Sequence, residues 1–201
     1  MSGDETSAER ELLHALPTTF SYSQARAAGL SRRRIYRLRD EGVIRAVSRG
    51  LYRRSDAEVV DFDLVEIAFR APEATLCLTT ALARHGLTDE IPARIDVALP
   101  RGRHRPSTSA PVAWHWFDPT TFGTGRTEIP LDRGHRIGLY GPERSIIDAL
   151  RLRHQEGPEL AYTALRRWLR RRDAVPARLL AMARAFPRVE RPLREALEIL
   201  L

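Results

Sequence analysis

Apolar positions near the start of the chain recur with the spacing of short helices. A first helix is predicted over Ala8–Leu16, where three leucines share one side and Pro17 ends the helix. A second is predicted over Phe20–Ala28, with Ser21 at its cap, and a glycine-containing turn follows it. Residues 1–7 are polar and are expected to be disordered.

The next segment has the pattern of a third helix. Ser31 can cap it, because a serine hydroxyl accepts a hydrogen bond from a backbone amide of the first turn. Ile35 and Leu38 lie three residues apart and can pack inward, while Gly42 ends the helix.

A β-hairpin is predicted directly after this helix. Val43–Val47 and Leu51–Arg53 are rich in strand-forming residues, and Ser48-Arg49-Gly50 joins them with glycine at the turn. Helix, glycine-containing turn, helix and hairpin follow one another in the order of a winged helix-turn-helix. In that motif the second helix of the pair enters the major groove of DNA.

The remaining pattern predicts an α+β protein with two parts. We expect a winged helix-turn-helix domain over residues 8–54, a helical linker over 55–71 and an α+β domain over 72–201 that ends in a helical tail. The predicted elements of this second domain are Ala74–His85, Ile95–Pro100, Val112–Phe117, Arg136–Tyr140, a helix opened by Pro142, Pro158–Arg172, Pro176–Phe186 and Pro192–Leu201.

Charge is concentrated in one stretch. Ser31–Arg54 holds nine arginines and two acids, a local charge of +7, whereas the other residues carry 24 basic and 24 acidic side chains. The chain has no lysine, so every one of these basic residues has the forked guanidinium that suits guanine and phosphate. A solvated arginine-rich helix is the plainer alternative, but the confinement of the charge favours a local site for duplex DNA.

The predicted DNA contacts fall into two groups. In the helix they are Ser31, Arg32, Arg33, Arg34, Tyr36 and Arg37, and in the hairpin they are Arg45, Arg49 and Arg53. The helix residues are expected in the major groove, and the hairpin residues at the backbone or minor groove. The exposed loop 101–111 adds Arg101, Arg103 and Arg105 as candidates for a further nucleic-acid or partner contact, although a solvated loop explains them equally well.

The sequence offers no complete catalytic or metal site. Asp61 and Asp63 have the spacing of a metal-binding carboxylate pair, but no glycine-serine turn precedes them, so linker acids explain them better. The histidines are scattered, and Cys77 lies alone in an apolar run typical of a buried thiol. We therefore expect no cofactor, no metal and no enzymatic activity.

Location follows from the same features. No apolar run approaches the ~20 residues that span a bilayer, and the first ten residues do not resemble a signal peptide. We expect a cytoplasmic protein, associated with the nucleoid when it is bound to DNA.

Two stretches resemble the AbiEi family, the antitoxin and transcriptional-regulator component of type IV toxin–antitoxin (abortive infection, phage-defence) systems. They are FSYSQARAAGLSRRRIYRLRDEGVIRAVSRGLYRR at 20–54 and LTTALARHGLTDEIPARIDVALPRG at 78–102, and YGPERSIIDALRLR at 140–153 supports them. The resemblance implies a repressor that binds promoter repeats of its own operon, as a homodimer or a cooperative assembly. It also implies opposition to a nucleotidyltransferase-type toxin.

Two rival functions remain open at this point. The first is a protein-interaction module that neutralises a toxin by direct contact and binds DNA only weakly. The second is an enzyme acting on nucleic acid, for which Asp61 and Asp63 would be the residues to test.

Overall fold

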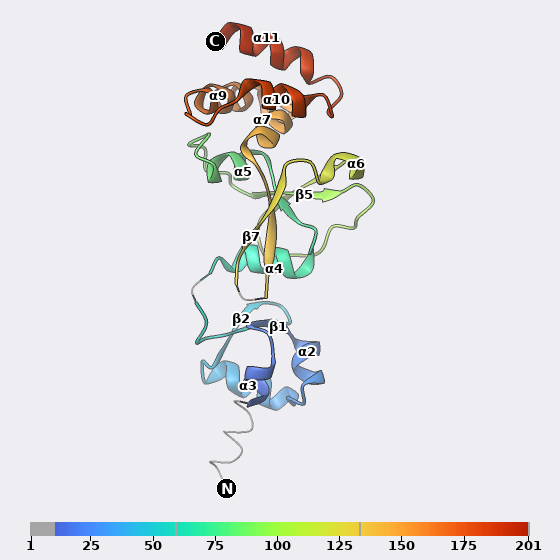
Figure 1. Cartoon of the computed structure of the whole chain (residues 1–201). Coiled ribbons are helices and arrows are strands. Elements are labelled where there is room, and N and C mark those ends of the chain that lie inside the picture. The colour runs from blue at the N-terminus through green and yellow to red at the C-terminus, as the bar shows by residue number, and fades with distance from the viewer. Residues whose placement is uncertain (1–10, 59, 133, 201) are drawn as a thin grey trace. The chain divides into compact units, whose positions relative to one another are not determined.

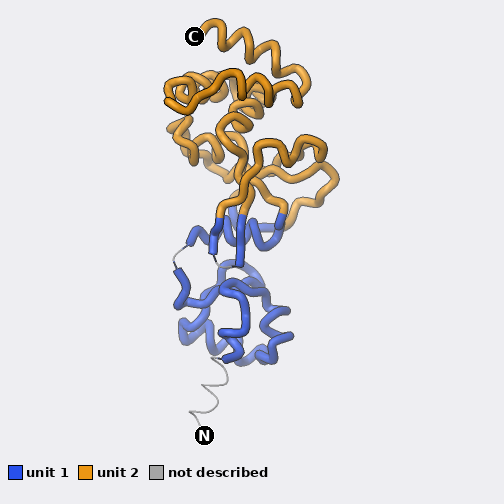
Figure 2. The backbone as a smooth tube through the Cα atoms, viewed as in Figure 1, with its two compact units in different colours: residues 1–72, 107–110, 130–136 blue, residues 73–106, 111–129, 137–201 orange. Residues whose placement is uncertain are grey.

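The computed structural model describes residues 11–58, 60–132 and 134–200, and the expected disordered segment 1–7 lies outside them. The chain forms two compact units (Figure 2). The first runs to Pro72 and also includes residues 107–110 and 130–136, and the second contains the rest. In the described part of the chain, no helix has both the length and the hydrophobicity that a membrane span requires.

The first unit has the element order of a winged helix-turn-helix (Figure 1). Residues 11–15 are helical. They are followed by β1 (Thr19–Ser21), α2 (Tyr22–Ala27), α3 (Arg32–Asp40), β2 (Ile44–Ser48), β3 (Leu51–Arg54) and α4 (Phe62–Arg70). Three antiparallel strands form a sheet in the order β1-β3-β2.

Local sequence fixes where α2 and α3 begin. The Ser21 hydroxyl accepts from the Gln24 amide at 3.1 Å, and the Gln24 side chain accepts from the Ser21 amide at 2.7 Å. This reciprocal pair is a capping box, which satisfies two amides that a helix start leaves unbonded. Ser31 caps α3 in the predicted way, accepting from the Arg34 amide at 3.2 Å.

A strand replaces the predicted start of the second helix. Phe20 belongs to β1, where it pairs with Tyr52 of β3, and its side chain is fully buried. The capping serine was identified correctly, but Phe20 lies before the cap, and its pairing with a residue 32 positions away has no local signal in the sequence. The helix in the predicted linker is likewise shorter than expected over 55–71, because α4 begins only at Phe62.

The second unit is built around a five-stranded sheet in the order β6-β5-β4-β8-β7. Its strands are β4 (Thr75–Leu76), β5 (Ile95–Pro100), β6 (Val112–Phe117), β7 (Arg126–Pro130) and β8 (Arg136–Tyr140). β4 runs parallel to β8 and antiparallel to β5, and β5 runs parallel to β6. Two strands were not predicted. β4 has only two residues inside the expected helix, and β7 is interrupted by polar and charged residues.

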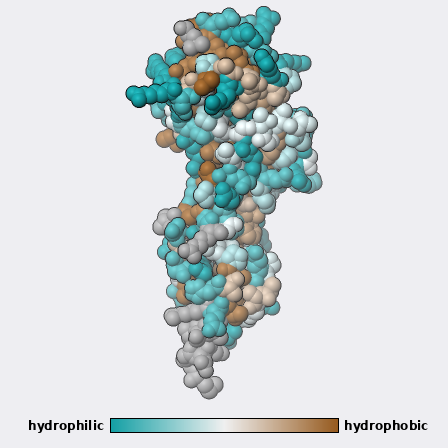
Figure 3. Space-filling model, in the orientation of Figure 1, coloured by the Kyte–Doolittle hydropathy of each residue, from teal (hydrophilic) through white to brown (hydrophobic). Residues whose placement is uncertain are grey.

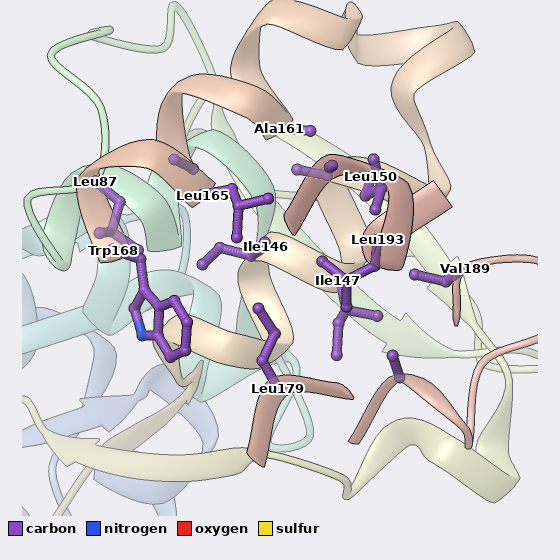
Figure 4. Close-up of a cluster of buried hydrophobic side chains, with 14 of the residues drawn as sticks. Leu87, Ile146, Ile147, Leu150, Ala161, Leu165, Trp168, Leu179, Val189 and Leu193 are labelled. Carbon is purple, nitrogen blue, oxygen red and sulfur yellow. The ribbon is translucent and has the colours of Figure 1, made fainter. Parts of the chain in front are cut away.

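Helices complete the second unit. They are α5 (Leu78–Arg84), α6 (Pro119–Phe122), α7 (Pro142–Arg151), α8 (Arg153–Glu156), α9 (Pro158–Leu169), α10 (Pro176–Ala183) and α11 (Glu190–Leu200). Figure 4 shows their shared core, where Ile146 and Leu150 of α7 meet Leu165 of α9 and Leu193 of α11. The predicted α+β fold class, with a winged helix-turn-helix first and helices last, is confirmed.

Candidate nucleic-acid interface

Helix α3 has one buried and one exposed side. Ile35 and Leu38 are 0% and 4% exposed and pack in the core of the first unit. Arg33 and Arg37 are exposed, and the 100° step of a helix puts them on the side opposite Ile35. The helix therefore presents two guanidinium groups away from its own core.

One flank of α3 borders an open groove of about 570 Å³. The groove is lined by Tyr22, Arg32, Tyr36, Arg39, Ala46, Ser48, Arg49, Gly50 and Tyr52. The guanidinium carbons of Arg32 and Arg39 lie 5.4 and 5.1 Å from the centre of the Tyr36 ring, so both cations are within range of a cation–π interaction with it. Arg39 also pairs with the adjacent Asp40 at 2.7 Å, so Arg32 supplies most of the positive charge that lies with this aromatic surface beside the exposed side of α3.

The hairpin is a short wing, and its turn is held in place. Gly50 has φ +73°, a conformation that favours glycine, and it allows the two-residue turn between β2 and β3. The Tyr22 amide donates to the Gly50 carbonyl at 2.8 Å, which ties the turn to the start of α2. Arg49, at the turn, is exposed and lines the groove.

Two of the predicted hairpin contacts do not join this surface. Arg45 is opposite Arg53 in the strand register, while the adjacent pair of Ala46 and Tyr52 lines the groove. Because neighbouring positions on a strand face opposite sides, Arg45 and Arg53 point to the other face of the sheet.

The prediction that Arg53 contacts DNA is wrong. Its side chain is 3% exposed, and its guanidinium forms an ion pair with Asp132. The same group donates to the Thr19 hydroxyl and to the Glu58 carbonyl, each at 3.0 Å. A guanidinium with these partners is not available to a phosphate group.

The other predicted helix residues have intramolecular contacts of their own. The Ser31 hydroxyl caps the helix, and Arg34 is half-buried. Arg37 Nε lies 3.9 Å from Glu41 Oε1, an exposed pair of the kind that water and salt weaken.

Six of the nine groove residues were absent from the sequence prediction: Tyr22, Arg39, Ala46, Ser48, Gly50 and Tyr52. Arg39 follows Tyr36 by three positions and therefore lies on the same side of α3, so helical spacing could have identified it. Tyr22 and Tyr52 belong to other elements and reach the groove only through the fold.

The basic loop belongs to the second unit. Arg101, Arg103 and Arg105 are exposed there. Arg103 pairs with Glu73 at 2.6 Å, and its carbonyl accepts from the Trp116 indole at 3.0 Å.

In the orientation of Figure 3, hydrophilic residues cover most of the visible surface and hydrophobic ones form small scattered patches.

The acids and the cysteine considered for chemistry have structural contacts. Asp61 caps α4, accepting from the amides of Asp63 and Leu64 at 3.1 and 3.2 Å. Cys77 is buried, and burial raises the pKa of its thiol well above the usual value. Within the residues that the structure describes, no three histidine, cysteine, aspartate or glutamate side chains gather as metal ligands would.

Comparison with known proteins agrees with this geometry. Residues 8–55 match the AbiEi_4 family, described as "Transcriptional regulator, AbiEi antitoxin". The resemblance predicted from the sequence is thus confirmed over the span that holds α3 and the wing. No match was found among curated proteins.

A solved structure shares the fold over most of the chain. It is the crystal structure of the RV2827C protein from Mycobacterium tuberculosis, with a TM-score of 0.55 and 17% sequence identity. The alignment covers 92% of this chain and 71% of that one. At this identity the likeness concerns the fold alone.

Proposed function

We propose that this protein is a sequence-specific DNA-binding repressor of its own operon and the antitoxin of a type IV toxin–antitoxin system. The observation that carries the proposal is the exposed side of α3, where Arg33 and Arg37 point away from the core beside the Arg32–Tyr36–Arg39 cluster. The family match over residues 8–55 supports a regulatory antitoxin.

In this proposal α3 reads bases and the wing holds the DNA backbone. Arg33 and Arg37 enter the major groove, where arginine makes forked contacts to guanine. Tyr36 and Arg32 line the protein groove beside α3, next to these base-reading residues. Arg49, at the wing turn, contacts phosphate. Arg45, on the other face of the sheet, and the half-buried Arg34 do not line the groove beside α3 and make no base contact in this proposal.

The size of the winged helix-turn-helix and the family match support a proposal for the assembly and the partners. A single winged helix-turn-helix contacts too little DNA for high affinity, so we propose that two or more copies of the protein bind repeats in the promoter. The cognate toxin is a nucleotidyltransferase-type enzyme. The exposed arginines of the 101–105 loop provide a weaker additional contact with nucleic acid or with a partner. The protein acts in the cytoplasm without enzymatic activity, cofactor or metal.

A gel-shift titration tests the proposal directly. The protein is titrated against its own upstream region and against scrambled DNA of equal length, at two salt concentrations. We expect a preference of ~10³-fold or more for the native fragment, as is typical of specific regulators.

The opposite result has a clear meaning. Equal affinity for both fragments, vanishing as salt rises, would indicate charge attraction alone. The rival function, a module that neutralises a toxin by direct contact, would then be preferred, and co-purification with a neighbouring gene product at high salt would support it.

A further inference from the structure

An arginine of α4 is hydrogen-bonded to the turn of the wing. Arg70 Nη2 donates to the Ser48 hydroxyl at 3.0 Å and to the Arg49 carbonyl at 3.1 Å. These two residues begin the turn that carries the exposed Arg49 side chain. Arg70 thus bonds to the backbone from which a proposed phosphate contact projects.

A buried carboxylate sets the direction of that arginine. Arg70 Nε donates to Glu66 Oε1 at 2.9 Å, and the Glu66 side chain is only 2% exposed. Because a guanidinium is planar, a bond at Nε leaves little freedom for Nη2. The position of Glu66 therefore decides where Arg70 meets the turn.

Glu66 is itself held by a distant part of the chain. Its Oε2 accepts from the backbone amides of Ser109 and Ala110 at 2.9 and 3.1 Å. Burial alone would raise the pKa of Glu66, but hydrogen bonds from Ser48, Arg70 and these two amides outweigh it and lower the pKa below its ordinary value. The carboxylate stays charged and keeps its ion pair with Arg70.

We infer that Arg70 is a positioning residue for DNA binding: with Glu66, it fixes the wing turn so that Arg49 reaches a phosphate. The inference rests on the proposed function and adds a residue that does not itself touch DNA. It predicts that Arg70 matters only while Arg49 is present.

A double-mutant cycle on the full chain tests this dependence. Arg49→Ala is expected to weaken operator affinity about five- to tenfold and to reduce the salt slope by about 1, the loss of one phosphate contact. Arg70→Ala should weaken binding by a similar factor. The double variant should bind within about twofold of Arg49→Ala, because the second change has nothing left to misplace.

A matched pair provides the control. Arg33 shares no contact with Arg70, so the effects of Arg33→Ala and Arg70→Ala should multiply. Multiplying effects in the Arg49 pair as well would overturn the inference, since Arg70 would then act on its own. Wild-type protein without operator preference would instead overturn the proposed function.

A conservative variant separates positioning from folding. Arg70→Lys keeps a positive charge beside Glu66, but a single ammonium cannot reproduce the fork to Glu66, Ser48 and Arg49. We expect a thermal midpoint close to that of the wild type and operator affinity as weak as that of Arg70→Ala. Wild-type affinity in this variant would show that the fork is not needed.

Discussion

The exposed arginines of α3 and the buried arginine of β3 come from the same basic stretch yet have opposite environments. Arg33 and Arg37 are exposed, whereas Arg53 is 3% exposed and ion-paired with Asp132. Charge density along the sequence does not distinguish them. A carboxylate supplied by a distant segment decides whether an arginine of this stretch stays exposed or supports the fold.

Asp132 is well suited to that second role. Besides Arg53, it accepts from the Thr19 hydroxyl at 3.1 Å and from the amides of Gly134 and His135 at 2.9 and 2.8 Å. Both oxygens of the carboxylate are therefore hydrogen-bonded. A buried ion pair of this kind contributes little over an apolar pair, but losing one partner is costly.

The largest expected effect is that of Asp132→Ala. It leaves the Arg53 guanidinium buried and without its counter-charge, and should lower the free energy of unfolding by about 3–5 kcal/mol. Urea denaturation followed by circular dichroism measures this. Asp56→Ala is the matched control, because Asp56 is 60% exposed in its pair with Arg54 and should contribute at most about 1 kcal/mol. Equal losses in the two variants would break the comparison.

Arg33→Ala and Arg37→Ala should weaken DNA binding without lowering stability, the reverse of Asp132→Ala. Each is expected to cost about 1–3 kcal/mol of operator binding and to relax sequence preference, since a base contact is lost. The free energy of unfolding should stay within about 0.5 kcal/mol of the wild type. Gel shifts on operator and random DNA measure the first effect, and equal losses on both would contradict the assignment to bases.

How far the sequence predicts this interface depends on the range of each interaction. The start of α3 at Ser31 and its buried Ile35 and Leu38 follow from local capping and spacing, and the structure has both. The ion pair of Arg53 joins residues 79 positions apart, so no local pattern reveals it. The same holds for Glu66, which meets amides 43 and 44 positions away.

Strands show the same limit. β5, β6 and β8 appear as continuous β-prone runs, and each was predicted. β1 and β4 have three and two residues, and partner strands rather than their own composition define them. Among the strands, those with a continuous β-prone run were therefore predicted, while those defined by distant partners were not.

Acid should destabilise the protein through Asp132. Burial alone would raise its pKa, but hydrogen bonds from Gly134, His135 and Arg53 lower it from 3.8 to about 2. The unfolded state then binds a proton before the folded state does, so stability falls as the pH drops from about 4 to about 2. The contribution is about 2 kcal/mol, fully present above about pH 5. Asp132→Asn should lack this part of the pH dependence in urea denaturation, and an unchanged profile would contradict the assignment.

The smallest effects are expected in the 101–105 loop, where arginines are exposed without a buried carboxylate. Arg101→Ala combined with Arg105→Ala should weaken operator binding about twofold and reduce its salt slope by at most about 1, with unchanged unfolding. Arg103 is the control, because Glu73, 2.6 Å away, already neutralises it. Arg103→Ala should change neither binding nor stability. An effect of Arg103→Ala as large as that of Arg33→Ala would mean that even a short ion pair such as Arg103–Glu73 does not remove an arginine from DNA contact, and the comparison between the two kinds of arginine would fail.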